Sequence, residues 1–248
     1  MDNIKSSETS EESVALISKY SPYLAEVRKR ILFILIVFAV AAAAGFIFYE
    51  RIIKFIIEIL SLRGVNIVFT SPFQFINLAI SSGMATGVVA ILPLLIYQTL
   101  SFLRPALRHK EYKMIIKTLP FSITLFFMGF SFGILIMKWQ IQLFLEKSIE
   151  LGIGNVLDIS RLISTVLLVS VFMGIAFQFP IIMILLISLG IVKTGYLRKQ
   201  RLWVYLFSIL FPILLPLDSI FADFLLALPL IILFELTLIL NQIFKKRS

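Results

Sequence analysis

The sequence predicts an all-α membrane protein with six transmembrane helices and both termini in the cytoplasm. Of its 248 residues, 60% are hydrophobic and 15% are charged, whereas about 25% of residues are charged in a soluble domain. The chain has room for six apolar segments of about 20 residues, the length that crosses about 30 Å of hydrocarbon. Its lysines and arginines gather between alternate apolar segments, and bases near span ends favour the cytoplasmic side.

The N-terminal part of the chain is expected to contain a tail, one span and an outer helix. Residues 1–13 are polar and lack a helical period, so we expect a mobile cytoplasmic tail at 1–19 before a single six-helix domain at 20–248. The first span, Ile31–Tyr49, directly follows the bases Arg28–Arg30. In Glu50–Ser71, polar and apolar residues alternate with a helical period, which is typical of an interfacial helix.

The second and third spans, Phe75–Leu103 and Thr118–Met137, are joined by a basic loop. This loop carries five bases and one acid, Glu111, and we expect it to fix the orientation of the chain in the membrane. Small and hydroxyl residues interrupt the second span, and such residues commonly mark helix packing in lipid. Trp139 follows the third span at a depth where interfacial tryptophans lie.

The last three spans differ in length. The fourth span, Leu162–Val192, contains Pro180, which removes a backbone donor and should kink the helix. A second basic loop, Lys193–Arg201, follows. The fifth span, Leu202–Leu217, has 16 residues and would extend about 24 Å, less than the hydrocarbon thickness. The sixth, Phe224–Phe244, is also short and returns to a basic C-terminus.

Charge and cysteine content exclude several functions. The N-terminal segment, the two basic loops and the C-terminus hold 17 of the 23 lysines and arginines, which predicts both termini inside. Because these bases lie at span ends, the net charge of +9 reflects topology and no nucleic-acid partner is expected.

The chain has no cysteine and a single histidine, His109, in the first basic loop. We therefore expect no disulfide, metal or other cofactor.

Five short motifs lie in a characteristic order along this topology. They are Y-L-A-E-V-R-K-R at 23–30, S-P-F-Q-F at 71–75, P-L-L-I-Y-Q-T-L-S-F-L-R-P-A-L-R-H-K-E at 93–111, F-Q-F-P at 177–180 and L-L-A-L-P-L-I-I-L-F-E at 225–235. In order, spacing and placement they resemble TatC, the multi-span subunit of the twin-arginine protein translocase. The resemblance covers the chain from Tyr23 to about Asn241. Tyr23 and Gln178 replace a histidine and a glutamate that are usual in the family.

The resemblance implies a receptor and core subunit of a translocase in the cell inner membrane, and no enzyme. Such a subunit binds the twin-arginine signal peptides of folded precursor proteins and recruits single-span TatA and TatB type partners for export driven by the proton gradient. It is expected to be a homo-oligomer within a larger complex.

The resemblance also implies two sets of site residues. Glu26 and Glu111 are expected to recognise the signal arginines, with Arg28 and Phe102 in the same site. Gln178 and Glu235 are expected to contact a partner subunit.

The residues themselves leave alternatives open at each of these positions. Two carboxylates suit two guanidinium groups, which bind carboxylates bidentately, but Glu26 could instead only neutralise Arg30, four residues along the same helical face. Glu111 has neighbouring bases that it could neutralise in the same way. Gln178, near the bilayer midplane, could pair within the fold with a carbonyl freed by Pro180. Glu235, about 15 Å into the membrane, could be a packing residue.

Two other classes of membrane protein compete with the translocase subunit. A small-solute secondary transporter would need several polar mid-membrane residues that converge on broken helices, whereas only Gln178 and Glu235 stand out. An intramembrane protease would need a Ser/His or paired-Asp site within the membrane, and Asp218 and Asp223 lie at an outer turn.

The glycines of the third and fourth spans are expected to be close-packing sites and not hinges; they are Gly129, Gly133 and Gly174.

Overall fold

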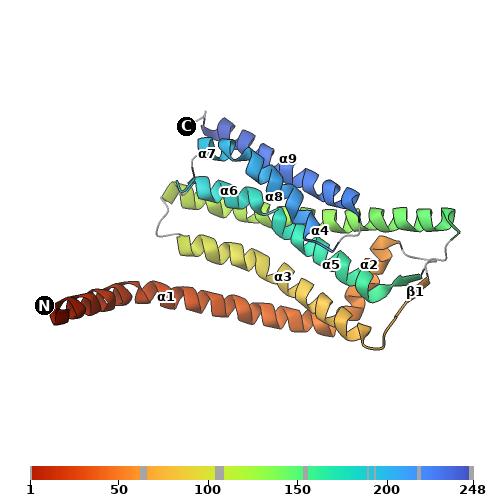
Figure 1. Cartoon of the computed structure of the whole chain (residues 1–248), viewed down its shortest axis with the longest axis horizontal. Coiled ribbons are helices and arrows are strands. Elements are labelled where there is room, and N and C mark those ends of the chain that lie inside the picture. The colour runs from red at the N-terminus through yellow and green to blue at the C-terminus, as the bar shows by residue number, and fades with distance from the viewer. Residues whose placement is uncertain are drawn as a thin grey trace.

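The computed structural model describes residues 2–61, 66–103, 109–152, 156–188, 190–192, 194–216 and 219–245. Long helices run roughly along one axis, and both chain ends lie at the same end of the bundle (Figure 1). Within the described residues, five helical segments are long and apolar enough to cross a membrane, namely Ala25–Ile47, Gln74–Thr99, Leu119–Glu150, Ile159–Ile187 and Ile220–Ile239. Another apolar helix, Arg201–Ile213, is shorter. The prediction of a mostly helical membrane protein is confirmed.

The first two helices meet at a short break near Phe48. Helix α1 spans Asp2–Ile47, so the structure continues a helix through residues that the sequence predicts to be a tail. Helix α2, Tyr49–Leu60, buries Ile53, Ile56 and Leu60 at helical spacing. This apolar face packs into the protein core, so the predicted outer helix is present but its buried side faces protein. It ends at Ser61 in the left-handed conformation common at C-caps.

Helices α3, Gln74–Leu103, and α4, His109–Glu150, form the next hairpin. The sequence predicts a loop that continues to Lys117, but α4 already begins at His109. The prediction of a solvated loop at His109 is therefore wrong for the backbone. The physical reason is helix propensity, because the stretch after His109 contains Lys110, Glu111, Lys113, Met114 and Lys117, and these residue types are good helix formers.

A break divides the fourth predicted span into two helices. Helix α5 spans Ile159–Ala176 and α6 spans Phe179–Ser188, with Phe177 and Gln178 between them. Pro180 is the second residue of α6, where its missing N–H costs no intrahelical hydrogen bond. The predicted distortion next to Pro180 is confirmed.

The C-terminal part contains three helices. The six-residue α7, Thr194–Lys199, lies within the second predicted basic loop. Helix α8 spans Arg201–Ile213 and α9 spans Ile220–Lys245. With 13 residues, α8 is even shorter than predicted, at about 20 Å. The prediction that the sixth span is also short is wrong, because α9 has 26 residues and its segment Ile220–Ile239 is long enough to cross a membrane.

A two-stranded parallel sheet joins the two outer segments, and the sequence analysis missed it. Strand β1, Asn66–Val68, pairs with β2, Val156–Asp158, and Val68 lies opposite Asp158. Asp158 then caps α5 by accepting from the main-chain N of Arg161 at 3.1 Å. Its other carboxylate oxygen accepts from Thr70 Oγ1 at 2.5 Å and Gln74 Nε2 at 2.7 Å. These hydrogen bonds, led by that of Thr70, lower the pKa of Asp158.

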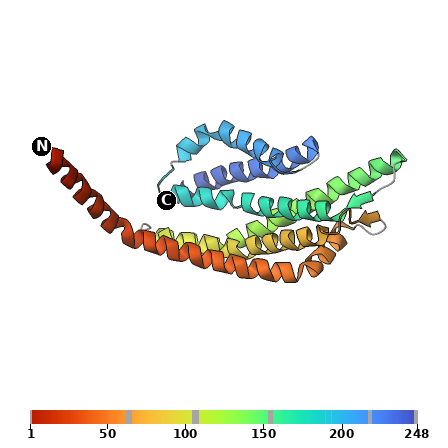
Figure 2. The same cartoon turned by 60° about the horizontal axis from the view of Figure 1, so that its bottom comes forward.

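Small residues bring the long helices together. Helix α1 lies along α3, α3 packs on α5, and α5 packs on α4, whereas α8 and α9 form a separate pair at the other side (Figure 2). A Cβ added to Gly83 of α3 would lie 2.7 Å from the carbonyl oxygen of Ala42 in α1. Between α3 and α5, Ser81 and Ser164 share a hydrogen bond of 2.9 Å. Small and hydroxyl residues in the second span therefore mark helix packing, as predicted.

The glycines of α4 and α5 are also packing sites. A Cβ on Gly129 would lie 2.6 Å from the carbonyl oxygen of Met173, and one on Gly133 would lie 2.7 Å from the Cα of Ser170. On the facing helix, a Cβ on Gly174 would lie 2.5 Å from the ring of Phe126. The prediction of close packing at these three glycines is confirmed.

Candidate functional site

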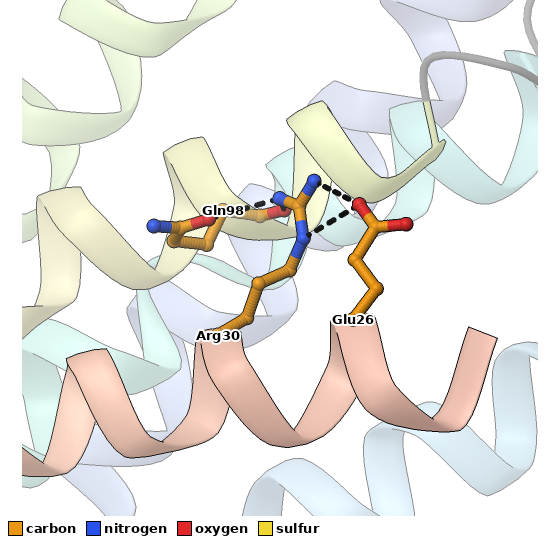
Figure 3. Close-up of polar contacts among 3 residues, drawn as sticks. All are labelled: Glu26, Arg30 and Gln98. Atoms are coloured by element: carbon orange, nitrogen blue, oxygen red, sulfur yellow. Dashed lines mark hydrogen bonds and ion pairs between the residues drawn. The ribbon is translucent and has the colours of Figure 1, made fainter. Parts of the chain in front are cut away.

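Glu26 and Arg30 lie one turn apart on α1, beside Gln98 of α3 (Figure 3). Arg30 donates from Nε and Nη2 to the same oxygen of Glu26, Oε1, at 3.1 and 2.6 Å. Its Nη1 donates to the main-chain oxygen and to Oε1 of Gln98, at 3.0 and 2.9 Å. The guanidinium of Arg30 therefore joins α1 to α3 at this point.

The local sequence explains this arrangement. The spacing of four residues places Glu26 and Arg30 on one helical face, and α1 packs along α3, so the face meets the last turns of α3. The pairing of Glu26 with Arg30, which the sequence left open as an alternative, is present in the structure. The sequence analysis missed Gln98 as their partner, although an amide among the apolar residues 93–103 is a signal that could have identified it.

Among the described residues, only one oxygen of the Glu26 carboxylate accepts a hydrogen bond. The Glu26 side chain is 50% exposed, and that of Arg30 is 21% exposed. Both hydrogen bonds from Arg30 go to Oε1, and among the described residues none goes to Oε2. Arg28 is exposed on the same helix. An external cation can therefore approach Glu26 from solvent.

The other two predicted signal-peptide residues lie outside the described side chains. Phe102 belongs to the last turn of α3 and Glu111 to the first turn of α4. The end of α3 and the start of α4 lie at the same end of the bundle as the chain termini (Figure 1). The backbone thus brings these positions to one end of the molecule, and recognition of the signal arginines by Glu26 and Glu111 stays a prediction.

Gln178 is paired inside the fold. It is buried in the break between α5 and α6. Its Nε2 donates to the main-chain oxygen of Ser122 at 3.1 Å, and the hydroxyl of Ser122 donates to its Oε1. The geometry supports the internal alternative, although through Ser122 of α4 and not through a carbonyl freed by Pro180. Contact between Gln178 and a partner subunit stays a prediction.

Glu235 has a counter-charge that the sequence analysis missed. It accepts from Arg201 Nη2 at 3.0 Å and from the hydroxyl of Tyr205 at 2.5 Å. The Glu235 side chain is 29% exposed and that of Arg201 is 42% exposed. Arg201 starts α8, and a base directly before an apolar segment is the sequence signal that could have pointed to it. The carboxylate thus ties α9 to α8 through an ion pair.

The chain is similar to known proteins over most of its length. The family described as Sec-independent protein translocase protein (TatC) matches residues 22–229. The Sec-independent protein translocase protein TatCy of Bacillus subtilis (strain 168) is 30% identical over 227 residues, which cover 89% of this chain and 87% of that protein. The TatC protein of Aquifex aeolicus (strain VF5) is 26% identical, with 91% and 95% covered.

A solved structure shares the fold. The crystal structure of the twin arginine translocase receptor TatC in DDM superposes with a TM-score of 0.78 at 26% sequence identity. The match covers 88% of this chain and 98% of that one.

Proposed function

The chain belongs to the TatC family of Sec-independent protein translocase proteins, and we propose that it is the receptor that binds twin-arginine signal peptides of folded precursors. The family match extends over residues 22–229. The chain is therefore a multi-pass membrane component of a protein translocase and not an enzyme. This assignment replaces the solute transporter and the intramembrane protease as explanations of its apolar helices.

The main observation that supports this binding site is the half-exposed carboxylate of Glu26. Within the described residues its Oε2 accepts no hydrogen bond. The guanidinium of a signal arginine can therefore donate one charge-assisted hydrogen bond to Oε2, or one each to Oε1 and Oε2. We place Arg28, Phe102 and Glu111 in the same site, at the end of the bundle where α3 ends and α4 begins. Glu111 would receive the second signal arginine.

A crosslinking experiment tests this function. A signal peptide with a photoreactive residue next to its two arginines is added to inside-out membrane vesicles that contain the chain. We expect crosslinks to α1 and to the start of α4, and we expect the same peptide with two lysines to crosslink much less, because an ammonium lacks the planar fork of guanidinium. Equal crosslinking of both peptides would contradict arginine recognition.

We further propose that residues 20–248 form a single domain that crosses the membrane six times, with both termini in the cytoplasm. The sixth crossing is α8, in addition to the five long apolar segments. The location of 17 of the 23 lysines and arginines supports this orientation.

Single-cysteine labelling tests the orientation, because the chain has no native cysteine. Cysteines at Lys110, Lys199 and Lys246 should react with an impermeant maleimide only after the cells are opened. Cysteines at Asn66 and Ile149 should react in intact cells. Labelling of position 110 from outside intact cells would overturn the six-crossing arrangement.

The proposed receptor works in a complex. We propose that single-span TatA and TatB type subunits join it, that the proton gradient drives export, and that several copies of the chain assemble together. Of the two positions predicted to contact a partner subunit, Glu235 is partly exposed whereas Gln178 is buried. Co-purification of single-span subunits with the chain in mild detergent would establish the complex. Loss of these subunits with Glu235→Gln would show that they contact the chain at Glu235.

A further inference from the structure

The guanidinium of Arg30 is bound to the Glu26 carboxylate. The proposed function places an arginine of the signal peptide on this same carboxylate. We propose that Arg30 competes with the signal peptide for Glu26. Arg30 stays bound to the Glu26 carboxylate until an arginine of the peptide displaces it, and Gln98 holds Arg30 in this position. The inference rests on the proposed function and adds two residues that determine the affinity of the same site.

The contacts of Arg30 are those that a bound ligand arginine would be expected to make. Toward Glu26 and Gln98, its nitrogens Nε, Nη1 and Nη2 donate four hydrogen bonds to three acceptor atoms. Glu26 supplies the negative charge from α1, and Gln98 supplies two neutral oxygens from α3. Guanidinium is the only side-chain group with donors in this fixed fork. A second guanidinium that reaches Glu26 therefore competes for Oε1 with a chemically identical group.

The exposure of the two paired side chains suits an exchange. Arg30 is the less exposed member of the pair, at 21% against 50% for Glu26. Arg30 thus lies toward α3, and Glu26 faces the solvent from which a ligand arrives. When a ligand arginine takes Oε1, Arg30 keeps the two oxygens of Gln98, so its charge is not left without partners. Partly exposed ion pairs are weak, and the exchange is accordingly easy.

The same geometry allows an opposite role, and the sign of one measurement separates the two. If Arg30 competes, its removal raises the affinity for the signal peptide, because the protein no longer has to give up a contact before binding. If Arg30 instead only positions Glu26 for the ligand, its removal lowers the affinity, because the carboxylate loses its fixed orientation.

The test measures binding of a fluorescent twin-arginine signal peptide to the purified full-length protein in lipid nanodiscs. With Arg30→Gln we expect binding roughly two- to fivefold tighter, the size of a weak ion pair converted to an affinity. Lys29→Gln is the matched control, because Lys29 is exposed on the neighbouring position of α1 and its removal changes the net charge equally. In the Glu26→Gln background, Arg30→Gln should add nothing, since its effect passes through Glu26.

The outcomes separate this inference from the proposed function. Weaker or unchanged binding with Arg30→Gln, while Glu26→Gln weakens binding, overturns the competitor and leaves the receptor in place. An equal gain with Lys29→Gln also overturns it, because the effect is then one of general charge. Failure of the unsubstituted protein to bind the peptide, or to respond to Glu26→Gln, overturns both.

Gln98→Leu provides an independent variant. It removes the side-chain oxygen that holds Nη1 of Arg30 at 2.9 Å but leaves the main-chain oxygen at 3.0 Å. We expect a smaller gain in affinity than with Arg30→Gln, in the same direction. A loss of affinity in a folded Gln98→Leu protein would contradict the role given to Gln98.

Discussion

Replacing Gly133 with valine is expected to lower the free energy of unfolding by about 1 to 3 kcal/mol, the range for overpacking a close contact. A Cβ at this position would lie 2.7 Å from the Cα of Ser170, 3.1 Å from its N and 3.2 Å from the carbonyl oxygen of Val169. All three atoms belong to the backbone of α5 and cannot move without the helix. The axes of α4 and α5 must therefore move apart. This separation weakens the dispersion contacts between the two helices wherever they pack together.

Equilibrium unfolding of the purified protein in mixed detergent micelles measures this loss. Gly195→Val is the matched control, because Gly195 lies in α7 and a Cβ there has no neighbour within 4 Å. Gly133→Ala should have a smaller effect than valine, because it adds no γ-methyl groups. Equal stability of the Gly133→Val and Gly195→Val proteins would show that α4 and α5 are not in close contact at this position.

Features that depend on local chemistry were predictable from the sequence. The missing N–H of Pro180 predicts the distortion between α5 and α6, and the missing side chain of Gly133 predicts a close helix contact. Apolar length predicts the long helices. In each case the physical cause lies within one segment of the chain, so no knowledge of the tertiary structure is needed.

Contacts between distant segments were not predictable in the same way. Glu235 and Arg201 are 34 residues apart, and their pairing depends on how α8 packs on α9. The strands β1 and β2 have three residues each, too few to show an alternating pattern. Each exists because the other lies beside it. The start of α4 was misplaced because charge was interpreted as a loop signal where helix propensity decides the backbone.

In the candidate site too, a pairing within one helix was predictable from the sequence and contacts between distant segments were not. The four-residue spacing of Glu26 and Arg30 predicts their pairing, but only the packing of α1 on α3 brings Gln98 to them. The internal pairing of Gln178 was one of two open alternatives, and its actual partner, Ser122, is 56 residues away. A polar residue in an apolar segment therefore predicts that a partner exists, and the fold decides which one it is.

Glu26→Gln and Glu111→Gln should each weaken signal-peptide binding by about 1 to 3 kcal/mol, the range for removing a charged partner from a hydrogen bond. The amide keeps the shape of the carboxylate but loses its charge and one acceptor oxygen. Because Glu26 is 50% exposed, water screens its charge and we expect a loss near the lower end of this range.

The same peptide titration, extended to the double substitution, decides whether the two carboxylates act together. Glu146→Gln is the matched control, because this exposed carboxylate lies toward the far end of α4 and has the same change in charge and shape. If each carboxylate holds one arginine of the pair, the double substitution should lose roughly the sum of the single losses, since the two arginines then bind at separate sites. Replacement of one peptide arginine by lysine should remove the effect of one glutamate substitution and leave the effect of the other. Unchanged binding in the double variant would return Glu26 and Glu111 to simple neutralisation of neighbouring bases.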